Sequence, residues 1–265
     1  MKNHRNRYSF YDKNDSFEVS VFSTVGDRED QQDSSGLVLR NNEGIITVAD
    51  GMGGAEGGRP AADIAVKSIN DRYESFECIE DFTGFFIETV KQSDYIINNL
   101  KNEKGEKMGA GSTVVSVALR DCLMNWISVG DSRIYLCRNN KLTQLTKDHN
   151  YLMALNEGVA CGEIGPEEYE KEKAKGEALI SYLGIGNLKL VDTNREPYIL
   201  EKDDIVLLSS DGLYKTLDSE TIETILNNFR NINEAADALE RKCARTAQKN
   251  NIIRDNTTFA IIKKL

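Results

Sequence analysis

The sequence I-I-T-V-A-D-G-M-G-G, residues 45–54, decides the fold of this chain. Its first five residues are apolar or β-branched, which is typical of a buried strand. Beyond the glycines, apolar side chains recur at helical spacing from Ala62 to Tyr73, and Pro60 suits a first helical turn because it lacks an N–H group. We therefore expect a strand that delivers Asp50 to a glycine-rich loop, where the backbone can approach a ligand closely.

Three further aspartates stand in short strings that end or interrupt strand-like runs: G-D-S-R-I-Y at Asp131, L-L-S-S-D-G-L-Y at Asp211 and R-D-N-T-T at Asp255. Any one alone is typical of a turn, because Asp-Gly is a common turn dipeptide. Together they indicate a hard-metal site, since a divalent cation with oxygen ligands offsets the repulsion between converging carboxylates. Metal-assisted phosphate hydrolysis is the leading hypothesis.

Working outward from residues 45–54, strand-like runs lie on both sides of two helical segments, and a second helix pair precedes the last strand. The pattern predicts an α+β fold, a four-layer αββα sandwich of two antiparallel sheets flanked by helix pairs. Strands are expected at 17–25, 36–40, 44–49, 112–119, 123–129, 134–137, 142–146, 188–191, 205–209 and 257–262. Helices are expected at 62–73, 82–100, 218–229 with Asp218 as N-cap, and 232–243.

We expect one domain over residues 15–265, preceded by a polar extension over 1–14. Between about 150 and 176 the composition turns acidic and lysine-rich, with Gly158, Gly162 and Gly165-Pro166 as breakers. This segment is expected to form short helices on a surface lid.

The bulk composition excludes several classes of protein. A net charge of −10, spread along the chain, argues against a nucleic-acid surface. No apolar run approaches the ~20 residues of a membrane span, and no signal-peptide pattern follows Met1, so we expect a cytoplasmic protein without a membrane partner. The five cysteines form no C-x-x-C pair, and His4 and His149 are the only histidines, so a zinc site is not expected.

In chain order, eight motifs resemble the metal-dependent protein serine/threonine phosphatases, the PP2C family, in its bacterial form, and they span nearly the whole sequence. They are G-D-R-E-D-Q-Q-D at 26–33, V-A-D-G-M-G-G at 48–54, G-A-G-S-T-V-V at 109–115, I-S-V-G-D-S-R-I-Y-L at 127–136, L-T-Q-L-T-K-D-H-N at 142–150, S-Y-L-G at 181–184, L-L-S-S-D-G-L-Y at 207–214, and D-N-T-T at 255–258.

The resemblance implies two Mn²⁺ or Mg²⁺ ions, with a bridging water as the nucleophile, and a role for each matching residue. Asp50 would bridge the ions, Asp211 and Asp255 would complete the first, and the carbonyl of Gly51 would serve the second. Asp33 would hold water in the outer shell, and Asp131 would join Asp211 at a third, weaker ion. Arg28 would bind the substrate phosphate.

Two departures from the family pattern affect the implied chemistry. Gln31 and Gln32 stand where many relatives have asparagine or glutamate, and Met52 stands where eukaryotic relatives carry a histidine proposed as general acid. Methionine has no proton to donate, so we assign no general acid. We expect His149 to be structural and Arg133 to pair with a neighbouring carboxylate.

The resemblance thus implies hydrolysis of phosphoserine and phosphothreonine in proteins that are targets of a Ser/Thr kinase, by a monomer. Two alternatives stay open: a catalytically inactive phosphoprotein-binding module of the same fold, and a metal-dependent phosphatase for small phosphate esters. The retained aspartates disfavour the first, because uncompensated carboxylates held together would destabilise the fold.

Overall fold

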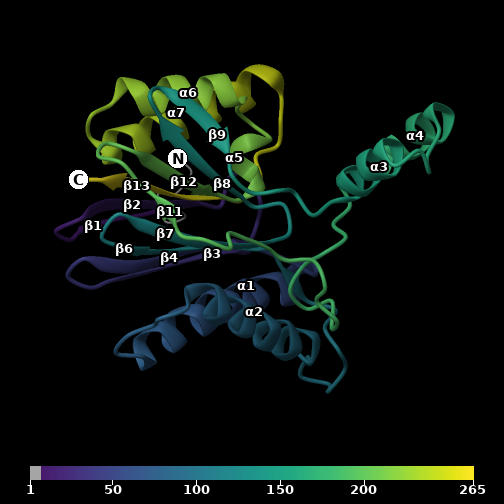
Figure 1. Ribbon diagram of the computed structural model, residues 1–265. Helices are drawn as coiled ribbons and strands as arrows, with labels where there is room; N and C mark the ends of the chain where they lie inside the picture. Colours follow the sequence, from purple (N-terminus) through teal and green to yellow (C-terminus); the bar gives the residue numbers. More distant parts are fainter. Residues whose placement is uncertain (1–6) are drawn as a thin grey trace.

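The computed structural model describes residues 7–265, and over that range two antiparallel sheets pack face to face with helices outside each (Figure 1). The predicted four-layer α+β sandwich is confirmed.

One sheet contains, within the described residues, six strands in the order β1, β2, β13, β12, β8, β9. Their bounds are β1 Arg7–Lys13, β2 Phe17–Thr24, β13 Thr257–Lys264, β12 Ile205–Ser209, β8 Arg133–Arg138 and β9 Lys141–Gln144.

The other sheet follows the order β10, β7, β6, β4, β3 in the same range, with β11 paired to β7 and β5 to β4. Its strands are β10 Asp192–Thr193, β7 Leu123–Val129, β6 Val114–Arg120, β4 Glu43–Met52, β3 Asp33–Leu39, β11 Tyr198–Ile199 and β5 Gly111–Ser112.

Strand alternation divides the apolar side chains into three packed layers. On β4, Ile46 and Val48 belong to the core between the sheets, whereas Ile45 and Ala49 pack against helices α1 and α2. The same period of two directs the side chain of Asp50 toward the six-stranded sheet. A third core joins the outer face of that sheet to α6 and α7.

The four long helices of the outer layers lie where they were predicted, but the first begins at Gly54 instead of 62 and the last ends at Asn250 instead of 243. They are α1 Gly54–Ser75 and α2 Phe82–Asn98 on one face, and α6 Ser219–Asn228 and α7 Ile232–Asn250 on the other, with a one-turn helix α5 Asp211–Tyr214 after β12. Asp218 caps α6 as predicted, because its side chain accepts a hydrogen bond from the Thr221 N–H at 2.8 Å. No described helix is both long and apolar enough to cross a membrane.

The lid segment projects away from the sandwich as a pair of short helices, α3 Tyr151–Ala160 and α4 Pro166–Glu172 (Figure 1). A 3₁₀ turn, Lys173–Lys175, completes it. Backbone hydrogen bonds close its base, since the Leu152 N–H donates to the carbonyl of Gly176 at 2.9 Å. The excursion is therefore attached through one narrow stem.

The structure differs from the expected elements at several places. The one-turn helix α5 and the two-residue strands β10 and β11 were not expected. The strand predicted at 188–191 is wrong, because this stretch is irregular. Strand β1 was not expected: it falls inside the predicted extension 1–14 and pairs along its length with β2. His4 and the rest of residues 1–6 lie outside the described part of the chain. The boundary at residue 15 stays a prediction.

Candidate active site

Segments far apart in the sequence meet around one cavity of about 650 Å³ at an end of the sandwich. Its lining includes five of the seven predicted site residues: Arg28, Asp50, Gly51, Asp211 and Asp255. Asp50 and Gly51 lie within β4, Asp211 begins α5, and Asp255 lies just before β13. The strand that carries Asp50 thus faces the two acids of the opposite sheet.

Asp33 and Asp50 lie directly opposite each other across the β3–β4 ladder. Like charges in such a pair repel, because directly opposed side chains share one face of the sheet. Asp33 is only 1% exposed. Burial is the main reason that the pKa of Asp33 is raised to about 7, with smaller contributions from the charges of Asp211 and Asp255.

One oxygen of the Asp33 carboxylate is satisfied and the other is not. Oδ2 accepts a hydrogen bond from the Ser210 hydroxyl at 2.8 Å, while Oδ1 is buried without a hydrogen-bond partner in the described structure. A buried acceptor without a partner is costly, so Oδ1 is suited to a bound water or ion.

The Asp50 carboxyl is buried and lies near four other aspartates. Its pKa is raised well above the usual range, first by burial and then by the charges of Asp33, Asp211, Asp131 and Asp255. At the backbone, its N–H donates to the Thr113 hydroxyl oxygen at 3.1 Å and its carbonyl accepts from the Thr113 N–H at 2.8 Å. The fold therefore holds Asp50 where its negative charge is unfavourable without a cation.

Gly51 is required by close backbone packing. A Cβ atom at this position would lie 2.1 Å from the carbonyl oxygen of Gly58 and 2.7 Å from that of Gln32. The glycine-rich loop thus lies flat against the start of α1, as the motif predicts.

The loop between β2 and β3 carries Arg28, whose guanidinium donates to Oδ2 of Asp255 at 2.6 Å. Asn256 anchors this loop: its side-chain N–H groups donate to the carbonyls of Val25 and Asp30, and its Oδ1 accepts from the Gln32 N–H. Arg28 and Asp255 are therefore held at one rim of the cavity.

Gln31, one of the departures from the family pattern, positions Asp33. Its side-chain oxygen accepts from the Asp33 N–H at 3.1 Å, and its amide donates to the Ser23 hydroxyl at 2.8 Å. The longer side chain is thus used within the structure to fix the start of β3.

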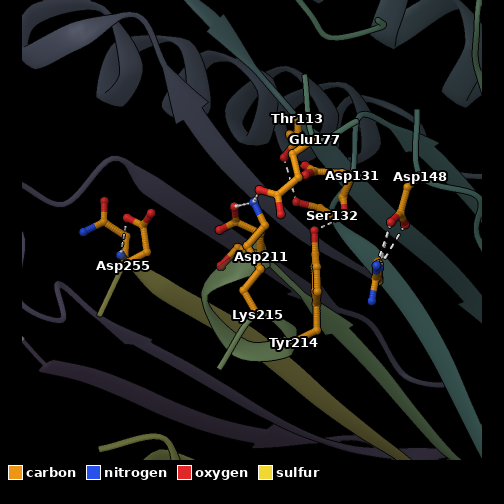
Figure 2. Close-up of polar contacts among 12 residues, drawn as sticks. Thr113, Asp131, Ser132, Asp148, Glu177, Asp211, Tyr214, Lys215 and Asp255 are labelled. Atoms are coloured by element: carbon orange, nitrogen blue, oxygen red, sulfur yellow. Dashed lines mark hydrogen bonds and ion pairs between the residues drawn. The ribbon is translucent and has the colours of Figure 1, made fainter. Parts of the chain in front are cut away.

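Asp131 lies outside the cavity lining, in the turn between β7 and β8, and Figure 2 shows it on the far side of Lys215 from Asp255. Its pKa is raised to about 6, mainly by burial and then by the charge of Asp211, while Lys215 opposes the shift. Tyr214 donates its hydroxyl to the backbone carbonyl of Asp131 at 2.9 Å. The electrostatic coupling joins Asp131 to Asp211.

Lys215 interacts with the same group of acids (Figure 2). Its ammonium lies 2.8 Å from Oδ2 of Asp211 and 3.5 Å from Glu177. Partial burial disfavours its charge, yet the pKa of Lys215 is raised because Asp211, Asp131 and Glu177 favour the ammonium.

Two candidate residues that we set aside from catalysis make structural contacts. Arg133 forms a two-pronged pair with Asp148, at 2.9 Å from Nε and 2.6 Å from Nη2, which matches the expected carboxylate partner. His149 is 1% exposed and its Nδ1 accepts from the Gly130 N–H at 3.2 Å. Burial lowers the pKa of His149, so a neutral imidazole is favoured.

The acids and the Gly51 carbonyl form a donor set suited to Mn²⁺ or Mg²⁺, since hard dications prefer oxygen ligands. The unpartnered oxygen of Asp33 and the raised pKa values fit a cation at this cavity. Over residues 7–265, no three His, Cys, Asp or Glu side chains have the spacing of a preformed metal site. Arg28 holds Asp255 in an ion pair, and Lys215 contacts Oδ2 of Asp211, so a metal at these carboxylates must displace Arg28 or share the Asp211 carboxylate with Lys215.

Three residues of the site were not identified from the sequence: Ser210, Asn256 and Lys215. The first two adjoin predicted acids inside the S-S-D-G and D-N-T-T strings, so their place in those motifs was the available signal. Lys215 follows Asp211 by one helical turn, a spacing that indicates an ion pair.

Comparison with known proteins gives a consistent result. The sequence model of the family described as protein phosphatase 2C matches residues 9–151. A serine/threonine phosphatase, stp, of Listeria monocytogenes is 30% identical over 229 residues, which is 85% of this chain and 88% of the relative.

Two solved structures share the fold. A serine/threonine phosphatase of S. agalactiae superimposes with a TM-score of 0.77 at 23% identity, covering 93% of this chain and 99% of the other. The catalytic domain of the phosphatase PstP, solved with two manganese ions, gives a TM-score of 0.74 at 25% identity, with 94% and 99% covered.

Proposed function

Because this chain belongs to the protein phosphatase 2C family of metal-dependent serine/threonine phosphatases, we propose that it removes phosphate from phosphoserine and phosphothreonine in proteins with two Mn²⁺ or Mg²⁺ ions. The observation that carries this proposal is the meeting of Asp50, Asp211, Asp255 and Arg28 around one cavity of about 650 Å³. A manganese-containing relative of the same fold supports the choice of ions.

In this proposal the carboxylates of Asp50, Asp211 and Asp255 and the carbonyl of Gly51 would hold the ions. Bound ions of this kind lower the pKa of water and neutralise charge on a phosphoryl group. Burial, followed by the charges of neighbouring aspartates, raises the pKa of Asp50, so nearby positive charge would favour its ionised form; this supports Asp50 as the residue that would hold both ions.

Arg28 is proposed to bind the phosphate. A guanidinium offers parallel N–H donors that match two phosphate oxygens. Its side chain is 57% exposed, so it can turn from Asp255 toward a substrate at the rim.

Asp33 is proposed to orient water through its unpartnered Oδ1, while Ser210 fixes the carboxylate through Oδ2. Met52 lines the same cavity but carries no exchangeable proton. We therefore assign no side chain of this chain as general acid, and the leaving serine or threonine oxygen takes its proton from solvent.

We also propose that residues 15–265 form the catalytic domain, that the lid over about 150–176 tunes access to the site, and that the chain acts as a monomer on substrates of a Ser/Thr kinase.

Phosphate release from a phosphothreonine peptide tests the proposal. We expect activity with added Mn²⁺, none with chelator, and a loss of at least about 100-fold in Asp50→Asn, as for removal of a charge-stabilising group. Phosphotyrosine, nucleotide and small aryl phosphates in the same series separate the substrate classes. Activity that survives both chelation and Asp50→Asn would remove the mechanism, and preference for nucleotides would favour the small-ester alternative.

A further inference from the structure

The ammonium of Lys215 lies among acids of three separate segments (Figure 2). It contacts Asp211 at 2.8 Å and Glu177 at 3.5 Å, and its charge also acts on Asp131. Asp211 begins α5, Asp131 lies in the β7–β8 turn, and Glu177 directly follows the lid. One lysine thus balances carboxylates that the fold brings together from across the chain.

The position of Lys215 is fixed by the short helix that carries it. Leu213, which is 0% exposed, anchors α5 in the core beneath the six-stranded sheet. The Tyr214 hydroxyl donates to the Asp131 carbonyl at 2.9 Å, and the guanidinium of Arg133 lies 3.6 Å from the centre of the Tyr214 ring. These contacts fix the backbone of α5 beside the turn of Asp131. The ammonium of Lys215 can therefore move away from the acids only if the Lys215 side chain changes its rotamer.

The side-chain exposures also favour a fixed contact on the Asp211 side. The Asp211 side chain is 16% exposed and that of Lys215 is 41% exposed, whereas Glu177 is 85% exposed. An ion pair with a shielded carboxylate is screened less by water than one at the open surface. Lys215 therefore forms its main ion pair with Asp211, and its ion pair with Glu177 is the more exposed one.

We propose that Lys215 is a tethered cation that takes the place of a third metal ion between Asp211 and Asp131. This inference rests on the proposed function, because it assumes that two ions bind at Asp50, Asp211 and Asp255. An ammonium and a dication compete for the same carboxylate oxygens, and the ammonium has no entropy of association to overcome because it is part of the chain. The chain should accordingly bind two ions rather than three.

The number of Mn²⁺ ions bound per chain tests the proposal directly, by calorimetry and by the electron paramagnetic resonance signal of free Mn²⁺. We expect two ions for the unaltered protein and for Lys215→Arg, which keeps the charge. Lys215→Gln should gain one further ion with a dissociation constant on the order of 10⁻³ M, as for sites with few charged ligands.

A matched control removes a paired lysine elsewhere. Lys263 lies 3.2 Å from Asp203 at the far end of β13, so Lys263→Gln should still bind two ions. Adding Asp131→Asn to Lys215→Gln should abolish the gained ion, because that site needs both Asp131 and Asp211.

The outcomes separate this inference from the proposed function. Three ions in the unaltered protein, or two in Lys215→Gln, would overturn the role of Lys215 while leaving the paired-ion site intact. A gained ion that survives Asp131→Asn would also overturn it, since the ion would then lie elsewhere. No Mn²⁺ binding at all would overturn both proposals together.

Discussion

The guanidinium of Arg28 lies 2.6 Å from Oδ2 of Asp255, although 227 positions separate the two residues in the sequence. Their side chains are 57% and 41% exposed, so water screens the pair and it costs little to open. Arg28, which is proposed to bind the substrate phosphate, thus forms an ion pair with Asp255, which is proposed to bind a metal ion. Arg28 can bind the phosphate only if it releases Asp255.

Arg28→Ala should therefore change two constants in opposite directions. Without the guanidinium, Asp255 is free and one repulsive charge is gone, so the dissociation constant of Mn²⁺ should fall by up to about fivefold, equivalent to a surface ion pair. The KM for a phosphothreonine peptide should rise by about tenfold or more, because a charged hydrogen bond to phosphate is lost. Arg28→Lys, which keeps the charge without the fork, should lie between. An unchanged KM would exclude Arg28 from phosphate binding.

Gly51→Ala should destabilise the fold itself. The added methyl would lie 2.1 Å from the Gly58 carbonyl, so the glycine-rich loop must move away from α1. Overpacking of this kind costs about 1–3 kcal/mol, or several degrees in melting temperature for a chain of this size. Thermal unfolding in chelator measures this effect without metal.

Gly165→Ala is the control for Gly51→Ala. No heavy atom lies within 4 Å of a Cβ at this position. Gly165 precedes α4, where alanine is a poorer N-cap, so a loss of at most about 1 kcal/mol is expected. Equal losses in the two variants would mean that the close approach at Gly51 is not the cause.

Shortening the lid should affect protein substrates selectively. The N–H of Leu152 already donates to the carbonyl of Gly176, so a few Gly and Ser residues can replace 153–175 without disturbing the stem. We expect KM for a phosphorylated protein to rise severalfold, whereas turnover of a small aryl phosphate should change little, because the helices project away from the sandwich (Figure 1). Parallel losses on both substrates would argue against a role in access.

The fold was predictable wherever one segment carries its own signal. The first four residues of Ile205–Ser209 are apolar and the whole segment forms the buried strand β12, and Asp218 caps its helix as expected. The strand expected at 188–191 does not form because a residue far away in the sequence binds this stretch. The carboxylate of Asp94, on α2, accepts hydrogen bonds from the backbone N–H groups of Gly184, Gly186 and Leu188. This stretch therefore folds against α2 instead of joining a sheet.

Strand β1 was not predicted for a different reason, which lies in the strand itself. All of its residues, Arg7–Lys13, are exposed, so this strand has no buried face of the kind that marks the other strands in the sequence. Likewise, the motifs identify the acids of the site, but the pairs that those acids form depend on the tertiary fold. Arg28 with Asp255 is such a pair, and short-range patterns contain no information about it.

The facing acids Asp33 and Asp50 give the metal-free protein an unusual dependence on pH. The pKa of Asp33 is about 7 in the folded state, against 3.8 as its ordinary value. Between these values the folded chain retains a proton that the unfolded chain has released, so the free energy of unfolding must fall as pH rises. Urea titrations in chelator from pH 4 to pH 7 should show this decline.

Asp33→Asn should make that decline shallower by up to about 1.4 kcal/mol per pH unit, because one titrating proton is removed. In saturating Mn²⁺ the trend should reverse for the unaltered protein, since metal binding favours ionised carboxylates and strengthens as they lose protons. A slope in chelator that is the same for Asp33→Asn and the unaltered chain would show that burial of Asp33 does not control it. A decline that persists in saturating Mn²⁺ would mean that the ions do not bind beside these acids.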